Sequence, residues 1–125
     1  MNFITPQDQK TYTIKINNNN KYIIDFLSIY NLIKFKSSHN ITIEIDSINT
    51  LENLKKNNNN IDMLINKFIY DIGAQILLLK QYGFGVKYFD LQDIIILNKN
   101  IFLFNNPNNI YSLSKKNNTY GFINL

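Results

Sequence analysis

The sequence has no cysteine, no arginine and no tryptophan, and it has a single histidine among its 125 residues. Without cysteine the chain has no disulfide, no thiolate nucleophile and no cysteine-based zinc site. His39 alone cannot build a multi-histidine metal site, and its place just before a predicted strand indicates a loop. The missing arginines remove the side chain that makes bidentate contacts to bases and phosphates. With a mild net charge of +4, we expect no specific nucleic-acid partner.

Long apolar runs are missing as well. The longest uninterrupted ones span about four residues, whereas a membrane helix requires ~20. The N-terminus has no basic segment followed by an apolar run, so no signal peptide is expected. We therefore expect a soluble, cytoplasmic protein with no membrane partner.

The residues in excess are asparagine, with 23 copies, and isoleucine, with 22, and all 13 basic residues are lysine. This bias is typical of an AT-rich genome, so we interpret most of the asparagines and lysines as mutational drift. Hydrophobic residues make up 45% of the chain and aromatic residues 14%, as in globular proteins. The length suits one apolar core, so a single domain spanning residues 1–125 is expected.

The first third of the chain is predicted to form strands. In the clearest run, Ile41, Ile43 and Ile45 alternate with polar residues, which is typical of a half-buried strand. Short polar breaks between the runs favour an antiparallel meander. The predicted strands are Thr11–Ile16, Tyr22–Phe26, Tyr30–Phe35 and Asn40–Asp46.

Two helices are predicted in the middle of the chain. The shorter covers Asn49–Lys56, capped by Thr50 or the residue before it, and lysines suit its C-terminal end. The polar linker Asn57–Asn60 separates it from a long helix over Ile61–Tyr82, which Gly83 ends. We expect the long helix to be buried on more than one side and to form the core of the fold. Its apolar stripe of 3.6-residue period comprises Ile61, Leu64, Ile65, Phe68, Ile69, Ile72, Ile76 and Leu79.

Further strands are predicted after the long helix. Asn98 and Lys99 form a plausible tight turn between two of them. A polar tail follows the asparagine-rich break that begins at Asn105. The fold class is therefore α+β, with an N-terminal antiparallel sheet, one long buried helix and a C-terminal β-hairpin. The three predicted strands are Val86–Phe89, Asp93–Leu97 and Asn100–Phe104.

From Ile41 to about Asn106 this order of elements resembles the centre of the protein-kinase fold. In that family a strand leads into the hinge, and a short helix and a long buried helix follow it. The catalytic loop and a hairpin that ends at the metal-binding Asp come next. The chain is also similar to uncharacterised kinase-like proteins of large AT-rich DNA viruses. The resemblance implies a truncated kinase-like domain, with strands up to the hinge in 1–46, helices, loop and hairpin in 47–106, and a tail in 107–125.

The catalytic loop of the family reads H-R-D-x-x-x-x-N, where Asp accepts the substrate proton and Asn holds magnesium. Asp90 matches the Asp, whereas Tyr88 and Phe89 replace the His and the Arg. Gln92 stands where a Lys normally stabilises the transferring phosphoryl group, and Ile95 stands where the Asn binds metal. Most of the catalytic groups implied by the resemblance are therefore missing.

The metal-binding Asp-Phe-Gly of the family is replaced by Asn105, Asn106 and Pro107. A neutral amide does not supply the negative charge that a hard divalent cation prefers. The first glycine is Gly73, so no glycine-rich loop lies over ATP phosphates, and no Lys–Glu pair of the strand-three and αC type is recognisable. We expect no enzymatic activity, no cofactor and no metal.

Asp90 and Asp93 lie three residues apart and could attract a cation, although two carboxylates without a third ligand are typical of a solvated turn. The leading hypothesis is a non-catalytic, kinase-like binding or scaffolding protein of viral origin, with a protein partner in the host cytoplasm. The alternatives are a nucleotide-binding remnant or split-kinase subunit, and a structural component of a particle. The residues of a possible degenerate cleft are Glu44, Ile45, Asp46, Asp90, Gln92, Ile95 and Asn105.

Overall fold

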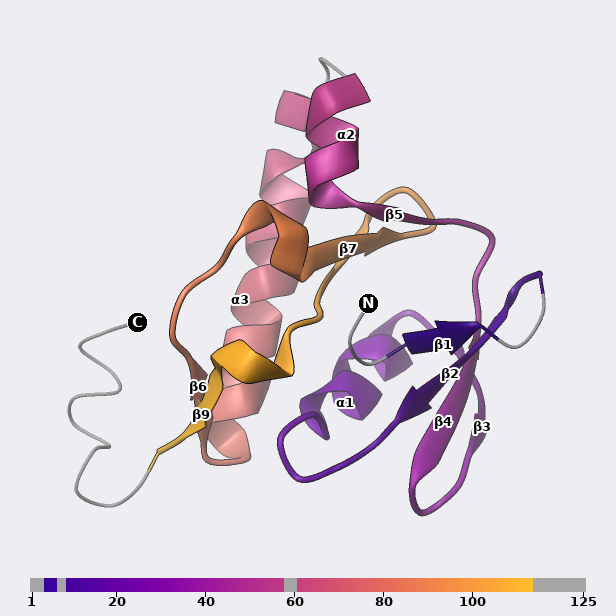
Figure 1. Cartoon of the computed structure of the whole chain (residues 1–125), viewed down its shortest axis with the longest axis vertical. Coiled ribbons are helices and arrows are strands. Elements are labelled where there is room, and N and C mark those ends of the chain that lie inside the picture. The colour runs from indigo at the N-terminus through magenta and orange to yellow at the C-terminus, as the bar shows by residue number, and fades with distance from the viewer. Residues whose placement is uncertain (1–3, 7–8, 58–60, 114–125) are drawn as a thin grey trace.

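The computed structural model describes residues 4–6, 9–57 and 61–113, and it has the predicted α+β architecture (Figure 1). The N-terminal half is a four-stranded sheet of order β1-β2-β4-β3 in which every neighbouring pair is antiparallel. One helix, α1, lies between the second and third strands in the chain. Its elements are β1 (Ile4–Pro6), β2 (Thr11–Lys15), α1 (Tyr22–Ile29), β3 (Ile33–Lys36) and β4 (Asn40–Glu44).

The C-terminal half combines a sheet of order β5-β7-β8, a separate β6-β9 pair and two helices. Three short 3-10 helices, η1 to η3, connect these elements. The bounds are β5 (Ile48–Thr50), α2 (Leu51–Asn57), η1 (Ile61–Leu64), α3 (Ile65–Gln81), β6 (Phe84–Val86), η2 (Leu91–Asp93), β7 (Ile94–Leu97), β8 (Ile101–Phe104), η3 (Pro107–Asn109) and β9 (Ile110–Ser112).

The alternation predicted for the strand now called β4 is confirmed. Ile41, Ile43 and Ile45 are buried, and Ile14 of β2 lies opposite Ile41 in the antiparallel register. The predicted meander is wrong, because β4 pairs with both β2 and β3 and the connection from β2 to β3 contains α1. The buried isoleucines of the sheet lie in one core with the apolar residues of α1 and of the β7-β8 hairpin.

The strand predicted over Tyr22–Phe26 is wrong, because this segment begins α1. Tyr22, Ile23, Phe26 and Leu27 are fully buried, a spacing that puts all four on one helical face. A short apolar run fits a strand or a buried helix equally well, so its period does not separate the two. The contact with the sheet decides in favour of the helix.

The short helix α2 begins where the sequence indicated. The Asn53 N–H donates to the Thr50 side chain at 3.0 Å, so Thr50 acts as the cap. Lys55 and Lys56 occupy the last turn, where the helix dipole favours positive charge. Of the predicted linker Asn57–Asn60, the first residue closes α2, and residues 58–60 lie outside the described residues.

The long helix forms from Ile65, because the first predicted turn, Ile61–Leu64, is the 3-10 helix η1. It is not buried on more than one side as predicted. Its buried residues are Asp71, Ile72, Gln75 and Leu79, which we call the inner face. The helix ends at Gln81, and a positive φ of 86° at Gly83 follows, as expected for a glycine terminator. The opposite side, called the outer face, consists of Ile69, Tyr70, Gly73 and Leu77.

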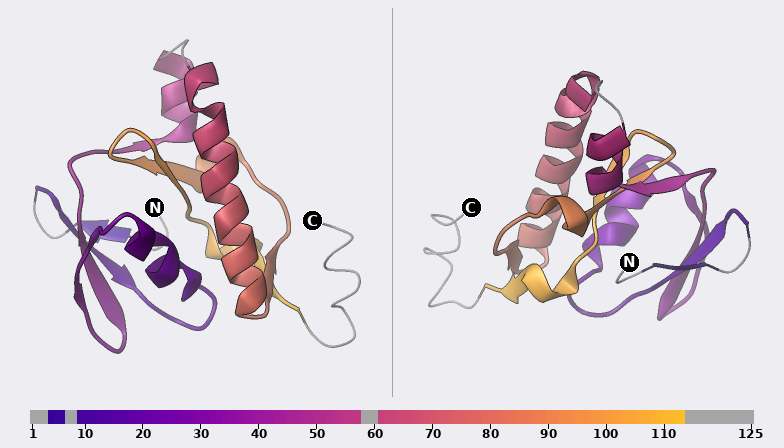
Figure 2. Two further views of the ribbon diagram at one scale, coloured as in Figure 1. Left: turned by 180° about the vertical axis from the view of Figure 1, so that it is seen from behind. Right: turned by 45° about the horizontal axis from the view of Figure 1, so that its top comes forward.

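The outer face carries exposed apolar side chains, with exposed fractions of 61% for Ile69, 59% for Tyr70 and 61% for Leu77. The view from behind shows α3 on the outside of the molecule with no other element in front of it (Figure 2, left). Of the predicted apolar stripe, Ile65 and Ile69 are exposed, whereas Ile72 and Leu79 are buried. None of the helices within the described ranges has both the length and the apolar character needed to cross a bilayer.

The predicted hairpin is confirmed. Asn98 and Lys99 both have positive φ, 52° and 70°, and every residue of β7 and β8 is buried. The strand predicted over Val86–Phe89 lies earlier, at Phe84–Val86, and pairs with β9. The sequence placed β9 in a polar tail, so this strand was missed.

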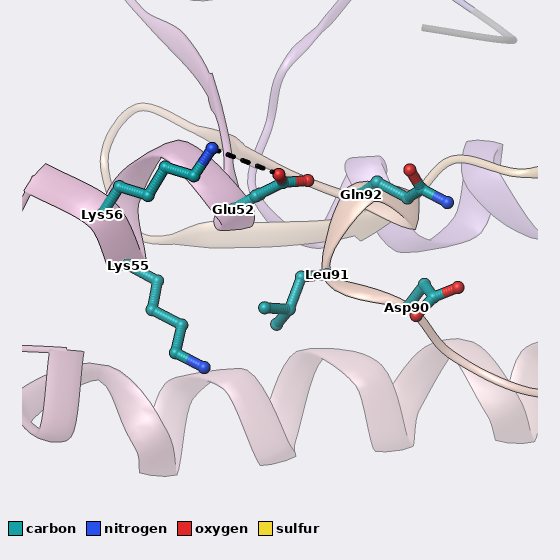
Figure 3. Close-up of a pocket in the computed structure, with 6 residues that line it drawn as sticks. All are labelled: Glu52, Lys55, Lys56, Asp90, Leu91 and Gln92. Carbon is teal, nitrogen blue, oxygen red and sulfur yellow. Dashed lines mark ion pairs between the residues drawn. The ribbon is translucent and has the colours of Figure 1, made fainter.

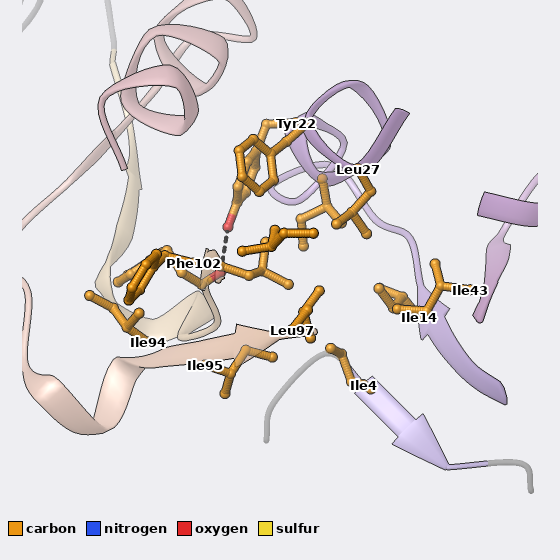
Figure 4. Close-up of a cluster of buried hydrophobic side chains, with 14 of the residues drawn as sticks. Ile4, Ile14, Tyr22, Leu27, Ile43, Ile94, Ile95, Leu97 and Phe102 are labelled. Carbon is orange, nitrogen blue, oxygen red and sulfur yellow. Dashed lines mark hydrogen bonds between the residues drawn. The ribbon is translucent and has the colours of Figure 1, made fainter. Parts of the chain in front are cut away.

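One hydrophobic core joins the two halves of the molecule. It contains α1, the inner faces of β2 and β4, and both strands of the β7-β8 hairpin (Figure 4). The Tyr22 hydroxyl donates to the Phe104 carbonyl at 2.9 Å, and this bond ties α1 directly to β8. The Asn98 side chain also accepts from the Asp46 N–H at 2.7 Å, which fixes the hairpin against the end of β4.

Candidate functional site

The loop after β6 holds the segment that resembles a kinase catalytic loop. Tyr88 and Phe89, which stand in place of the family's His and Arg, have exposed fractions of 57% and 38%. The Phe89 ring packs edge-to-face on Phe104 with centroids 5.1 Å apart. Aromatic packing therefore attaches this loop to the hairpin, and Asp90 follows it on the surface.

Asp93 is the polar centre of the loop. It is only 5% exposed, and its carboxylate accepts from the Asn106 amide at 2.8 Å, the Asn109 amide at 3.0 Å and the Asp90 N–H at 3.2 Å. The Asn105 N–H donates to the Asp93 carbonyl at 2.7 Å. These donors compensate for the water that the buried carboxylate loses. The solvated turn expected for Asp90 and Asp93 is therefore wrong for Asp93.

The loop and the segment at the end of the hairpin are thus bound to each other. The Asn106 side chain uses its amide for Asp93 and its carbonyl oxygen for the Asn108 N–H, at 3.1 Å. In the resemblance to kinases, this segment stands where the metal-binding Asp-Phe-Gly lies. Here its amides satisfy the nearest carboxylate, so that carboxylate is already coordinated by protein N–H groups.

Asp90 borders an open depression of about 580 Å³ between α2 and the loop (Figure 3). Glu52 pairs with Lys56 at 3.5 Å across one turn of α2. The lining residues carry charges of both signs on exposed side chains, where ion pairs contribute little. Among the described residues no three His, Cys, Asp or Glu side chains converge to hold a metal. The lining residues are Glu52, Lys55, Lys56, Asp90, Leu91 and Gln92.

The seven residues of the predicted cleft lie in different surroundings. Glu44 is exposed and pairs with Lys34 at 3.3 Å, and Asp46 pairs with Lys10 at 3.4 Å. Asp90 and Gln92 line the depression beside α2. The other three are buried, with exposed fractions of 2% for Ile45, 2% for Ile95 and 4% for Asn105.

A second polar cluster, not predicted from the sequence, lies between α1 and α3. The Asp71 carboxylate is fully buried and accepts from the Tyr30 hydroxyl at 2.5 Å, the Lys67 ammonium at 2.7 Å and the Phe102 N–H at 2.9 Å. The Lys67 ammonium also lies 4.3 Å from the centre of the Tyr30 ring. Burial, and then the hydrogen bond to Asp71, raises the pKa of Tyr30. All the groups of this cluster are satisfied by one another.

Gln75 extends the cluster along the inner face of α3. Its amide nitrogen donates to the Phe102 carbonyl at 2.7 Å, and its oxygen accepts from the Phe104 N–H at 2.9 Å. A signal for both residues was present in the sequence: Asp71 and Gln75 interrupt an otherwise apolar stripe four residues apart. That spacing indicates polar groups placed on the buried side of a helix.

No protein-family model, no curated protein and no solved structure matches the chain.

Proposed function

We propose that the chain is a non-catalytic, kinase-like binding module whose partner is a protein. The order of elements supports this: β4 leads to α2, α3 follows, and the Asp90 loop and the β7-β8 hairpin come next. This is the order that the resemblance to kinases describes. The similarity to viral kinase-like proteins makes the cytoplasm of an infected host the proposed location.

The observation that carries the non-catalytic half of the proposal is the bonding of Asp93. Phosphoryl transfer depends on positioned metal ions and on neutralisation of the phosphate charge. Asp93 is the carboxylate nearest in sequence to Asp90. It already accepts hydrogen bonds from the side-chain amides of Asn106 and Asn109 and from the Asp90 N–H. Asn105, at the position of the family's metal ligand, is a buried neutral amide. Asp90 is left with no acidic partner for a metal-bound triphosphate in this loop.

The outer face of α3 supports the binding half of the proposal. Ile69, Tyr70 and Leu77 are each more than half exposed on a single helix. Exposed apolar side chains gathered on one surface mark sites of protein contact. The two halves of the proposal therefore rest on different parts of the molecule.

Thermal denaturation with increasing ATP tests the non-catalytic half, with and without magnesium, and with Asp90→Ala as the matched variant. A ligand present at 100 times its Kd stabilises a protein by about 2.7 kcal/mol, which raises the Tm of a domain this size by more than about 4 °C. We expect no saturable, magnesium-dependent rise in Tm for either protein. A saturable rise that Asp90→Ala removes would contradict the proposal and support the nucleotide-binding alternative.

A further inference from the structure

We propose that the outer face of α3 binds the same face of a second copy, with the two helices antiparallel. Ile69, Tyr70 and Leu77 are between 59% and 61% exposed, although 22 apolar residues are buried in the core of the described ranges. A hollow of about 620 Å³ lies on this face, lined by Ile69, Tyr70, Gly73, Ala74, Ile76 and Leu77. The helix is 17 residues long, about 25 Å at 1.5 Å per residue, and offers one continuous surface.

Gly73 is the first sign that something packs closely on this face. Glycine inside a helix weakens it, so an internal reason for the residue is expected. The other described glycines have one: Gly83 has a positive φ of 86°, and a Cβ on Gly85 would lie 3.0 Å from the Tyr111 ring. A Cβ on Gly73 would meet no atom within 4 Å. The fold of one chain therefore does not require a glycine here, whereas close approach of another surface does.

The face is complementary to itself. Ile69, Gly73 and Leu77 are spaced four residues apart and form one ridge, with a gap at Gly73 between two large side chains. Ile69 lies two residues before position 71 and Gly73 lies two residues after it. A two-fold axis at that level places Ile69 of each copy over Gly73 of the other, because an antiparallel pair inverts the order of residues. Ile69 of each copy thus fills the gap at Gly73 of the other copy.

Two charged residues near the ends of this surface fit the same two-fold arrangement. Asp62 and Lys80 lie nine residues before and nine residues after position 71, and both are exposed. In the antiparallel pair each aspartate comes to the level of the other copy's lysine, whereas a parallel pair places like charges together. This complementarity favours a second copy over an unrelated apolar partner. The inference deepens the proposed function, on which it rests, by naming one partner.

Sedimentation velocity of the purified chain, from about 1 to 200 µM, tests self-association over the range expected for a small interface. We expect a concentration-dependent monomer–dimer equilibrium. Gly73→Leu fills the gap and raises helix propensity, so it should raise the Kd at least tenfold while it raises the Tm of the monomer. Because that variant is more stable, lost association cannot be attributed to unfolding. Gly73→Leu with an unchanged Kd would overturn the proposal.

Two charge variants test the antiparallel arrangement. Lys80→Glu and Asp62→Lys should each associate more weakly alone, because like charges then meet. Mixed together, they should form a heterodimer as tight as the wild type, because both cross-pairs become complementary. Failure of the mixture to associate would overturn the antiparallel pairing. A wild type that stays monomeric at the highest concentration would overturn the inference entirely, while the outcome of the ATP titration would still decide whether the module is non-catalytic.

Discussion

The two faces of α3 differ from those of an ordinary surface helix, because the inner face buries two polar residues beside Ile72 and Leu79. The inner face buries Asp71 and Gln75 completely or almost completely, with 0% and 1% of each exposed, while the outer face exposes Ile69 and Leu77, each at 61%. Surface helices normally turn apolar residues inward and polar residues outward. The comparison indicates that the two faces have different roles, one within the chain and one outside it.

The inner face supplies hydrogen-bond partners that a further strand beside β8 would otherwise supply. β8 is an edge of its sheet, and edge strands leave N–H and C=O groups unpaired. Asp71 and Gln75 accept from the N–H groups of Phe102 and Phe104, and Gln75 donates to the Phe102 carbonyl. Two side chains of α3, together with the Tyr22 hydroxyl on the Phe104 carbonyl, thus supply hydrogen-bond partners for the strand. The outer face has no such task among the described residues, so its apolar side chains are available for contact.

The largest effect is expected for Asp71→Ala. The substitution leaves the Phe102 N–H and the Tyr30 hydroxyl without their acceptor, and it removes the ion-pair partner of the partly buried Lys67. Removing one partner of a buried ion pair costs about 3 to 5 kcal/mol, and we expect about 3 because Lys67 retains some contact with water. Urea denaturation at a concentration too low for self-association measures the loss, with the exposed Asp62→Ala as control. A loss below about 1 kcal/mol would mean that the cluster does not hold α3 in place.

Gln75→Leu should rank second. It leaves a carbonyl and an N–H of β8 buried without partners, which costs about 2 kcal/mol after the gain from the apolar side chain. The matched control is Gln81→Leu at the exposed end of the same helix. The difference between the two urea midpoints isolates the contribution of the hydrogen bonds. Equal midpoints would show that β8 does not depend on Gln75.

Tyr22→Phe should cost about 1 kcal/mol through loss of the hydrogen bond to the Phe104 carbonyl. Burial raises the pKa of Tyr22 above its ordinary value. Its neutral form is therefore favoured by folding, so its contribution is complete below about pH 10, the unfolded value, and is lost as the pH rises further. Unfolding free energies from pH 8 to 11 should fall more steeply for the wild type than for Tyr22→Phe. Parallel curves would contradict this account of Tyr22.

The smallest effect is expected on the outer face. Leu77→Ala should change the unfolding free energy of the monomer by less than about 0.5 kcal/mol. Leu79→Ala, two residues away and 1% exposed, should cost about 2 to 5 kcal/mol. Both are measured at a concentration too low for self-association. If Leu77→Ala were as damaging as Leu79→Ala, the outer face would be part of the monomer's own core.

Local patterns predicted much of the fold. Alternation identified β4, Thr50 marked the start of α2, Gly83 ended α3, and Asn98 and Lys99 identified the hairpin turn. The helix α1 was missed because a run of eight mostly apolar residues fits two periods. Sheet order, and with it the wrong meander, depends on pairings between distant segments that local patterns do not encode.

The candidate site was also predicted only in part. The replacements around Asp90 could be read residue by residue, because each stands at a fixed spacing from it. The partners of Asp93 and Asp71 could not, since Asn106, Asn109 and Phe102 are 13 to 31 residues away in the chain. A sequence shows that a polar residue lies on an apolar stripe, but only the packed structure shows which group it satisfies.

The central claim is that this molecule works by contact and not by turnover. Release of phosphate from magnesium–ATP by the pure chain tests it most directly, with Asp90→Ala measured in parallel. The account predicts release no faster than the blank for both proteins, because the amides of Asn106 and Asn109 already occupy the buried carboxylate of the loop. Magnesium-dependent release by the wild type that Asp90→Ala abolishes would contradict it.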